Sequence, residues 1–251
     1  MIKFTLKEYK ILLQLALDYG YKFGNFEESF IHNRSIKLKC LLRHDVDSEL
    51  AQLSQMAQIE SELKIRATYF LMLRSTVYNL YSIEALQIVN ELKKLGHSVA
   101  LHFMPEYHQT GLKNIADWIK KECCLLEDIF GVRVQAFSFH QPSPEIIKAR
   151  IALPGLINAY SEECLNDYFY VSDSNMDWRG KNIEEIFING KPPKIQLLIH
   201  PMWWTKNRMQ TLSKWKNVLS GQQSLIVSHW RKRERTLMRL KTFGAKNRRS
   251  R

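Results

Sequence analysis

The sequence contains no uncharged apolar run approaching the roughly eighteen residues that a membrane-spanning helix requires. Its first residues, MIKFTLKEYKILLQLALDYGYKF, carry a charge every few positions and have no cleavage site of small residues, so they do not resemble a secretory signal. None of the four cysteines forms a Cys-x-x-Cys pair, and Cys123 and Cys124 are neighbours in a helical pattern, which favours buried free thiols. These absences lead us to expect a cytoplasmic protein.

The chain also lacks a linker rich in glycine, serine or proline, and it has no internal repeat or low-complexity segment. Its 251 residues match the size of a single (β/α) barrel. Acidic residues are scarce, because 25 Asp and Glu stand against 37 Lys and Arg, giving a net charge of +12. Such an excess suits an anionic partner, either acidic glycan, lipid phosphate or nucleic acid, and does not choose among them.

Strand and helix patterns alternate along most of the chain. Apolar runs typical of buried strands lie at 39–47, 67–73, 98–103, 134–140, 156–160, 169–172 and 195–200. Amphipathic helix patterns lie at 5–23, 48–63, 82–95, 112–130 and 144–152. This βα spacing predicts an α/β fold, a distorted or incomplete (β/α) barrel with about seven parallel strands.

Only helical patterns remain near the carboxyl end, and the tail RKRERTLMRLKTFGAKNRRSR from Arg231 onward is strongly basic. We therefore predict a barrel domain over 1–204, including an N-terminal helix, and a helical basic C-terminal extension over 205–251. No nucleic-acid recognition motif accompanies the basic tail, so a solvated face or an anionic membrane surface is the better expectation than nucleic acid. Weak, salt-sensitive binding to anionic vesicles should then disappear when 231–251 is deleted.

The first strand pattern ends in a cluster of ionisable side chains. The stretch 39–47 (KCLLRHDVD) begins apolar and closes with Arg43, His44, Asp45 and Asp47. In α/β folds, ligands bind at the carboxyl edge of the sheet. Because Asp45 and Asp47 are two residues apart in an extended chain, they share a face and can converge on one cation or one water. The structural alternative is a turn in which both carboxylates bond backbone amides.

Histidines end three later strand patterns, at His102, His140 and His200. A single histidine in such a place is usually structural, but three of them with the paired aspartates predict a shared site at the carboxyl edge. Asp and His together suit zinc or a neighbouring divalent metal. Such a metal acidifies bound water and polarises a carbonyl, while a spare carboxylate serves as base and a spare imidazole as acid.

These residues resemble the motifs of the polysaccharide deacetylases in the NodB-homology carbohydrate-esterase group, over about residues 40–204. The resemblance is carried by 43–47 (RHDVD), 96–102 (GHSVALH), 137–142 (FSFHQP), 173–178 (DSNMDW) and 198–201 (LIHP). The first of these has one extra residue between its two acids. Five motifs in the family's order are a specific signal.

The resemblance implies a metal-dependent hydrolase that removes an N-acetyl or other acyl group from a sugar in surface polysaccharide biosynthesis or modification. It implies that Asp45 is the base and His200 the general acid. It also implies Asp47 and His102 as ligands of a divalent metal, with zinc the expected ion. The expected partner is an N-acylated sugar or glycan.

The third metal ligand departs from the family pattern. The family's second metal histidine follows the first by four residues, and that position is Glu106 here. Glu106, His108 or His140 could complete the set, and we favour His140 because it rises from a strand end, whereas Pro105 sends the other two into an irregular loop. The missing histidine also motivates an alternative, a catalytically silent relative that binds glycan or organises a biosynthetic complex.

Four residues are expected to contact the substrate: Arg43, Trp178, Arg179 and Trp204. Trp178 belongs to the stretch that walls the acyl pocket in the family. Trp204 could stack on a sugar face, although core packing is an equal alternative. Arg179 could meet an anionic sugar group, and its structural alternative is a solvated surface arginine.

Overall fold

The computed structural model describes residues 3–107 and 112–233. Its strands are β1 (Lys22–Gly24), β2 (Lys39–Val46), β3 (Thr68–Leu71), β4 (Ser98–Phe103), β5 (Ala136–Phe139), β6 (Ile157–Asn158), β7 (Phe169–Ser172) and β8 (Lys194–Ile199). Its helices are α1 (Leu6–Asp18), α2 (Glu28–Ile31), α3 (Leu53–Glu62), α4 (Ile83–Lys94), α5 (Leu112–Phe130), α6 (Pro144–Lys148), α7 (Ile183–Asn189) and α8 (Thr211–Arg233). Single helical turns also occur at η1 (Pro105–Tyr107), η2 (Glu163–Asp167), η3 (Ser174–Met176) and η4 (Pro201–Trp203).

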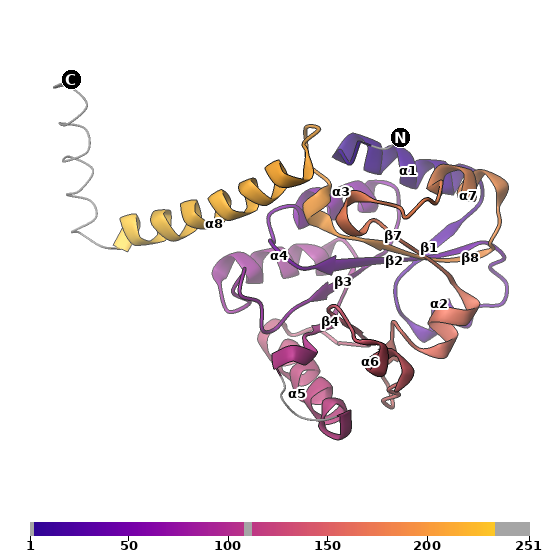
Figure 1. Ribbon diagram of the computed structural model, residues 1–251, viewed down its shortest axis with the longest axis horizontal. Helices are drawn as coiled ribbons and strands as arrows, with labels where there is room; N and C mark the ends of the chain where they lie inside the picture. The colour runs from indigo at the N-terminus through magenta and orange to yellow at the C-terminus, as the bar shows by residue number, and fades with distance from the viewer. Residues whose placement is uncertain (1–2, 108–111, 234–251) are drawn as a thin grey trace. The chain divides into compact units, whose positions relative to one another are not determined.

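The strands form one curled, all-parallel sheet in the order β6-β5-β4-β3-β2-β8-β7, with β1 paired to the first half of β2. Helices α7, α1, α3, α4 and α5 line the outside, each in contact with the next (Figure 1). No strand pairing between β6 and β7 closes the sheet within the described residues. The fold is therefore an open half-barrel, which confirms the predicted incomplete (β/α) barrel with a helical extension.

The side chain of Gln196 crosses the inside of the curl near this open edge. The Gln196 amide of β8 donates to the carbonyl oxygens of Ala159 and Cys164, at 3.2 and 3.1 Å. Its own carbonyl oxygen accepts a hydrogen bond from Arg43 Nη1 at 3.2 Å. Gln196 thus joins the segments that follow β6 to the middle of the sheet.

The chain divides into two compact units, residues 1–209 and residues 210–251. The first contains the whole sheet and its surrounding helices, and the second contains α8. None of the described helices is both long enough and apolar enough to cross a bilayer.

The start of the chain departs from the sequence prediction. The expected helix over 5–23 ends at Asp18, because Gly20 adopts a left-handed conformation (φ 88°) that closes it. The following residues then form β1. A Cβ on Gly24 would lie 2.4 Å from the Phe30 ring, so this short strand requires glycine where Phe30 approaches the backbone. Helix α7 was also not predicted, and it is capped by Asn182 and closed by Gly190.

The two faces of β2 lead to different environments. Leu41 belongs to the apolar cluster inside the curl, which comprises Phe26, Ile31, Leu41, Phe70, Ala100, Ala136, Ala159, Cys164 and Tyr168. Since side chains alternate along a strand, Arg43 and Asp45 point to this same inner side, closer to the carboxyl edge. His44 points outward, toward the layer of helices. The inner side of β2 thus places the charged side chains of Arg43 and Asp45 next to the apolar cluster that contains Leu41.

A buried polar cluster around Glu60 connects the outer helices to the sheet. The Tyr9 and Tyr69 hydroxyls donate to the Glu60 carboxylate at 2.5 and 2.9 Å, and His44 Nε2 lies 2.8 Å from the same group. All four side chains are fully buried. Burial raises the pKa of Glu60, but His44 and the other nearby donors outweigh it, so the net pKa is lowered. Glu60 is therefore a buried, ionised carboxylate, and its charge is stabilised by side chains from α1, β2 and β3.

We expect Glu60→Gln to lower the free energy of unfolding at neutral pH by about 1–3 kcal/mol, because charge-assisted hydrogen bonds to a buried carboxylate are lost. A carboxyl group with a lowered folded pKa stabilises the protein above its unfolded pKa of about 4.3 and loses that effect as the pH falls. The difference in the free energy of unfolding between the variant and wild type should thus become smaller as the pH falls from about 5 to about 3. Urea titrations followed by fluorescence measure it. The matched control is Glu62→Gln on the same helix, because Glu62 is an exposed carboxylate whose loss should leave the free energy of unfolding unchanged at each pH. A difference between Glu60→Gln and wild type that stays constant across the pH range would contradict the conclusion that Glu60 is ionised in the folded protein.

Candidate metal centre

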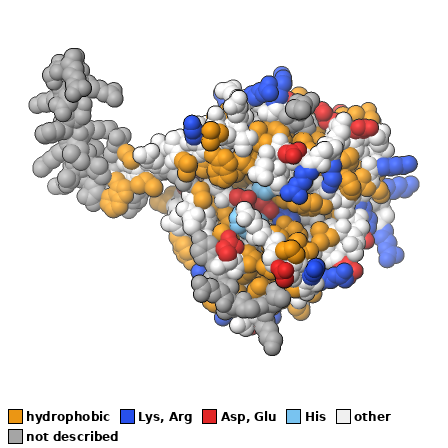
Figure 2. Space-filling model, in the orientation of Figure 1, with side chains coloured by type: hydrophobic (Ala, Val, Ile, Leu, Met, Phe, Trp, Pro, Cys, Tyr) orange, Lys and Arg blue, Asp and Glu red, His pale blue; other side chains and the backbone are white. Residues whose placement is uncertain are grey.

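Three strand ends bring their side chains together around Asp47. Asp47 Oδ1 lies 3.1 Å from His102 Nε2 and 3.5 Å from His140 Nδ1. The ligand atoms of these three residues all lie within 4.8 Å of one another. In Figure 2, carboxylate and histidine side chains gather in a hollow of the face shown. The fold therefore brings together the acids and imidazoles that the strand ends predicted.

The orientation of His102 is fixed from the neighbouring strand. Ser138 is the register partner of His102 across the β4–β5 pair, and its hydroxyl lies 2.7 Å from His102 Nδ1. Both residues are buried. With Nδ1 engaged, Nε2 is the nitrogen that faces Asp47. A partner on the far ring nitrogen is the usual arrangement around histidines that bind metal.

The donor set fits a divalent cation. Asp47 Oδ1 is buried and has no hydrogen-bond partner among the described residues. A buried polar atom without a partner is costly, and a cation bound between Asp47 and the two imidazoles would remove that cost. Burial raises the pKa of Asp47, but the neighbouring histidines outweigh it and hold the pKa far below its usual range. One carboxylate and two imidazoles are ligands that zinc accepts.

Among the three candidates for the third ligand, His140 lies in the cluster. Glu106 is exposed in η1, where its charge contributes to raising the pKa of His140, after the larger effect of the contact with Asp47. His108 lies outside the described residues. The strand end thus places His140 among the clustered candidate ligands, together with Asp47 and His102.

Asp45 is held by a fully buried arginine. Arg43 Nε and Nη2 donate to the two carboxylate oxygens of Asp45, at 2.7 and 2.8 Å. The guanidinium also donates to the Tyr160 hydroxyl at 3.3 Å, and it lies over the rings of Tyr160 and Phe70, 4.8 and 5.3 Å from their centroids. Burial raises the pKa of Asp45, but Arg43 outweighs it and lowers the pKa. Arg43, expected to contact substrate, is 0% exposed, and its contacts orient Asp45.

His200 is positioned by Asp173 at the end of β7. His200 Nδ1 lies 2.7 Å from Asp173 Oδ1, and its backbone amide donates to the same carboxylate. Its other nitrogen, Nε2, lies 3.7 Å from Asp47 Oδ2. Burial lowers the pKa of His200, but Asp173 outweighs it and the pKa rises to about 9. His200 therefore offers a protonated imidazole at the edge of the cluster.

Trp204 completes the support of Asp173. Its indole N–H donates to Asp173 Oδ2 at 2.7 Å, and the ring is fully buried against Phe4 and Tyr9. No face of this ring is open to stack on a sugar, so its contacts correspond to the core-packing alternative. The sequence indicated 173–178 only as a motif similar to one of the family's, and it did not predict this contact between Trp204 and Asp173.

Trp178 and Arg179 lie in the loop after η3. Trp178 is half-buried and stacks on Phe4 with ring centroids 5.9 Å apart. Arg179 is exposed and has a left-handed backbone (φ 53°). Within the described residues, neither forms a hydrogen bond or ion pair with the metal-ligand cluster. Substrate contact by these two side chains stays a prediction.

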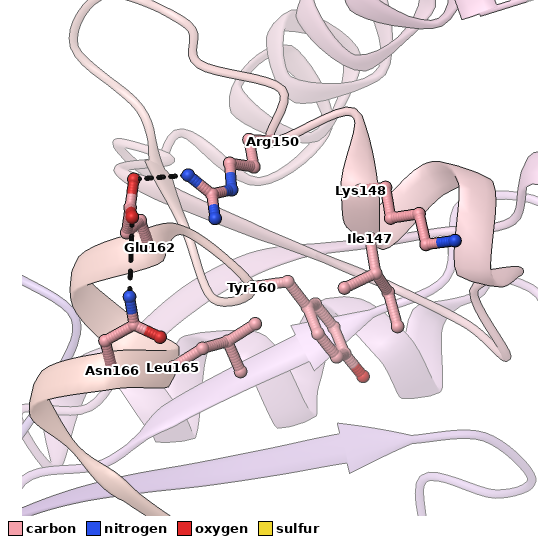
Figure 3. Close-up of a pocket in the computed structure, with 7 residues that line it drawn as sticks. All are labelled: Ile147, Lys148, Arg150, Tyr160, Glu162, Leu165 and Asn166. Carbon is pink, nitrogen blue, oxygen red and sulfur yellow. Dashed lines mark hydrogen bonds and ion pairs between the residues drawn. The ribbon is translucent and has the colours of Figure 1, made fainter.

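A pocket of about 480 Å³ lies among the segments that follow β5 and β6 (Figure 3). It is lined by Ile147, Lys148, Arg150, Tyr160, Glu162, Leu165 and Asn166. The hydroxyl of Tyr160 contacts Arg43, which in turn holds Asp45, so one wall of the pocket is two hydrogen bonds from the Asp45 carboxylate. Four of its seven lining residues are charged or polar, so its walls differ from the mostly apolar lining typical of small-molecule sites. Sequence patterns did not indicate this pocket.

We expect Asp47→Ala to abolish stoichiometric zinc binding, because it removes the one carboxylate among the three clustered ligands. Ser138→Ala should weaken zinc affinity by about 10–100-fold, since the His102 ring loses the contact that orients it. Metal content after dialysis and competition with a chromogenic chelator measure the two effects. The exposed His32, which pairs with Glu163, gives the control variant His32→Ala with unchanged zinc affinity. Stoichiometric zinc in Asp47→Ala would rule out this centre.

No protein-family model matches the chain, and no curated protein matches it. Solved structures do. A Streptococcus pyogenes deacetylase, PplD, in complex with acetate is 14% identical, with 85% of this chain and 86% of that chain covered and a TM-score of 0.46. A family 4 carbohydrate esterase from Bacillus anthracis is 13% identical, with 84% of each chain covered and a TM-score of 0.44.

The chain is also similar to BA3943, a CE4 family pseudoenzyme from Bacillus anthracis. The two are 16% identical with a TM-score of 0.41, and the match covers 75% of this chain and 61% of the pseudoenzyme. The similar structures thus include a deacetylase, a family 4 carbohydrate esterase and a CE4 family pseudoenzyme. Identities and TM-scores this low assign neither a family nor an activity to this chain.

Proposed function

We propose that this protein is a metal-dependent hydrolase that removes an acetyl or other acyl group from an N-acylated sugar in surface polysaccharide biosynthesis or modification. One observation carries the proposal. At a single edge of the sheet, the Asp47–His102–His140 ligand cluster lies beside two further groups. These are the carboxylate of Asp45 and the imidazole of His200. Ligands, base and acid are the three components that hydrolysis of an amide needs.

Asp47, His102 and His140 would hold the metal. When bound, a divalent cation acidifies water and polarises the carbonyl of the acyl group. Asp45 is suited to act as the base, because its carboxylate is ionised and fixed by two hydrogen bonds from Arg43. Asp45 Oδ2 lies 3.7 Å from His102 Nε2, so this carboxylate borders the ligand cluster and can take a proton from water there.

His200 is suited to act as the general acid. Its Nδ1 is engaged by Asp173, which leaves Nε2 as the nitrogen directed to the cluster. In the proposed reaction a water oxygen bonds to the acyl carbon and the carbon–nitrogen bond breaks. Asp45 receives the proton of water and His200 gives its proton to the departing amine. The products are a carboxylic acid and a free amino sugar.

Release of acetate by the metal-loaded chain tests the proposal. Purified protein would be stripped with chelator, reloaded with zinc, cobalt or manganese, and incubated with N-acetylglucosamine oligomers while acetate is measured. We expect acetate release from the reloaded protein and none from the stripped protein. Stoichiometric metal without release from any N-acylated sugar would support the silent glycan-binding alternative and overturn the proposal.

A further inference from the structure

Helix α8 presents a row of large apolar side chains to solvent. Their exposed fractions run from 42% to 65%, in the residues Leu212, Trp215, Leu219, Ile226 and Trp230. Exposed apolar side chains that occur singly are ordinary, but a contiguous apolar surface marks a site of interaction. Two of the five are the tryptophans Trp215 and Trp230, which add apolar area to the surface.

The row lies along one side of the helix. At about 100° per residue, the five positions fall within an arc of roughly 60°. Their separation from Leu212 to Trp230 extends over about 27 Å of helix axis at 1.5 Å per residue. Buried positions of the same helix, Lys214 and Val218, fall outside this arc. The five residues thus form an exposed apolar stripe along one side of α8, which excludes Lys214 and Val218.

The sequence around the stripe is basic and free of acids. No Asp or Glu occurs between Glu185 and Glu234. Basic residues lie before, within and at the end of α8: Lys206, Arg208, Lys214, Lys216, Arg231, Lys232 and Arg233. Residues 234–251 lie outside the described part of the chain, and their sequence adds further lysines and arginines. An anionic surface would complement both ends of this segment, since residues 217–230 contain no lysine or arginine.

We propose that α8 binds the surface of an anionic membrane, with the apolar stripe inserted at the boundary between headgroups and acyl chains. An amphipathic helix with a basic polar side and Trp and Leu on the other lies in this interface, and its affinity grows with both buried apolar area and anionic lipid content. Tryptophan is the residue that most favours the headgroup level. Each basic residue near the surface adds attraction to the anionic leaflet.

A second copy of α8 is the other occupant that the stripe could receive, and charge disfavours it. Helices that pair through an apolar seam use oppositely charged residues beside the seam to fix the partner. α8 has no acidic residue to pair with the lysines and arginines of another copy. Two such helices side by side would bring like charges together, whereas anionic phospholipid neutralises them. The proposal does not depend on the hydrolase activity.

Co-sedimentation of the full chain with vesicles tests the proposal. Vesicles of phosphatidylcholine alone are compared with vesicles that contain about 30 mol% phosphatidylglycerol, at low and at high salt. We expect binding to the anionic vesicles, weakened by salt, and at least about tenfold weaker binding for the double variant Trp215→Ser/Trp230→Ser. Tryptophan emission should shift to shorter wavelength when wild type binds.

Tyr81→Ser provides a matched control, because Tyr81 is an aromatic residue with 72% exposure outside α8. Its binding should equal that of wild type, and circular dichroism should show that both variants keep their helix content. No binding to anionic vesicles, or equal binding by wild type and the tryptophan variant, would overturn the proposal. A wild-type dimer in solution that the tryptophan variant converts to monomer, without vesicle binding, would assign the stripe to a second copy instead.

Discussion

Replacing Asp45 with asparagine should reduce the rate of acyl removal by about a thousandfold and leave zinc affinity within about threefold of wild type. The reason for the first effect is that asparagine cannot accept a proton from water, and a positioned base contributes about 10²–10⁴-fold. The reason for the second is that Asp47, His102 and His140 hold the metal and Asp45 pairs with Arg43. Turnover of an N-acetylated oligosaccharide and zinc content measure the two quantities on the same sample.

The design separates a base from a ligand. Asp47→Asn removes charge from the ligand cluster and should lose zinc and turnover together. Asp167→Asn, at an exposed carboxylate that pairs with Lys194, is the matched control and should change neither. Full turnover in Asp45→Asn would show that another group takes the proton, and loss of zinc in the same variant would make Asp45 a ligand.

Arg43→Met should lower the free energy of unfolding by about 3–5 kcal/mol, the cost of removing one partner from a buried ion pair. Arg43 is fully buried, and its loss leaves the Asp45 carboxylate in the interior without the two hydrogen bonds from the guanidinium. The Tyr160 hydroxyl and the Gln196 carbonyl also lose their contact with the guanidinium. Urea denaturation followed by fluorescence and circular dichroism measures the difference.

Two further variants isolate the cause. Arg150→Met removes an exposed arginine from a pair with Glu162 of the same 2.7 Å length, and should change stability by less than about 1 kcal/mol. Arg43→Met combined with Asp45→Leu removes both charges and should recover most of the lost stability, because an uncompensated buried charge is then absent. If the single Arg43 variant is as stable as the Arg150 variant, the ion pair is not what holds the strand end.

The location of the site followed from the sequence because each element of it stands at the end of an apolar run. The alternation of a strand places Asp45 and Asp47 on one face, and parallel strands deliver their carboxyl ends to one edge. His102, His140 and His200 satisfy the same rule, and the structure brings all three to Asp47. Local patterning was sufficient wherever backbone direction alone decides where a side chain goes.

The supporting contacts were not predictable, because they join residues with no spacing relation. Ser138 meets His102 through strand register, and Glu60 meets Tyr9 and Tyr69 through the packing of α1 and α3 on the sheet. Arg43 is the instructive case. An arginine beside two aspartates at a strand end suggests an open site, yet its side chain lies inside the fold. Only the tertiary structure shows which charged groups are paired with each other.

The glutamine near the open edge of the half-barrel, Gln196, links that edge to the arginine that holds the proposed base, Asp45. Gln196 binds the backbone after β6 with its amide nitrogen and Arg43 with its amide oxygen. Separation of the two rims therefore withdraws a contact from the guanidinium that orients Asp45. A change in the distance between β8 and the segments after β6 would thus alter the hydrogen bonds of the arginine beside the proposed base.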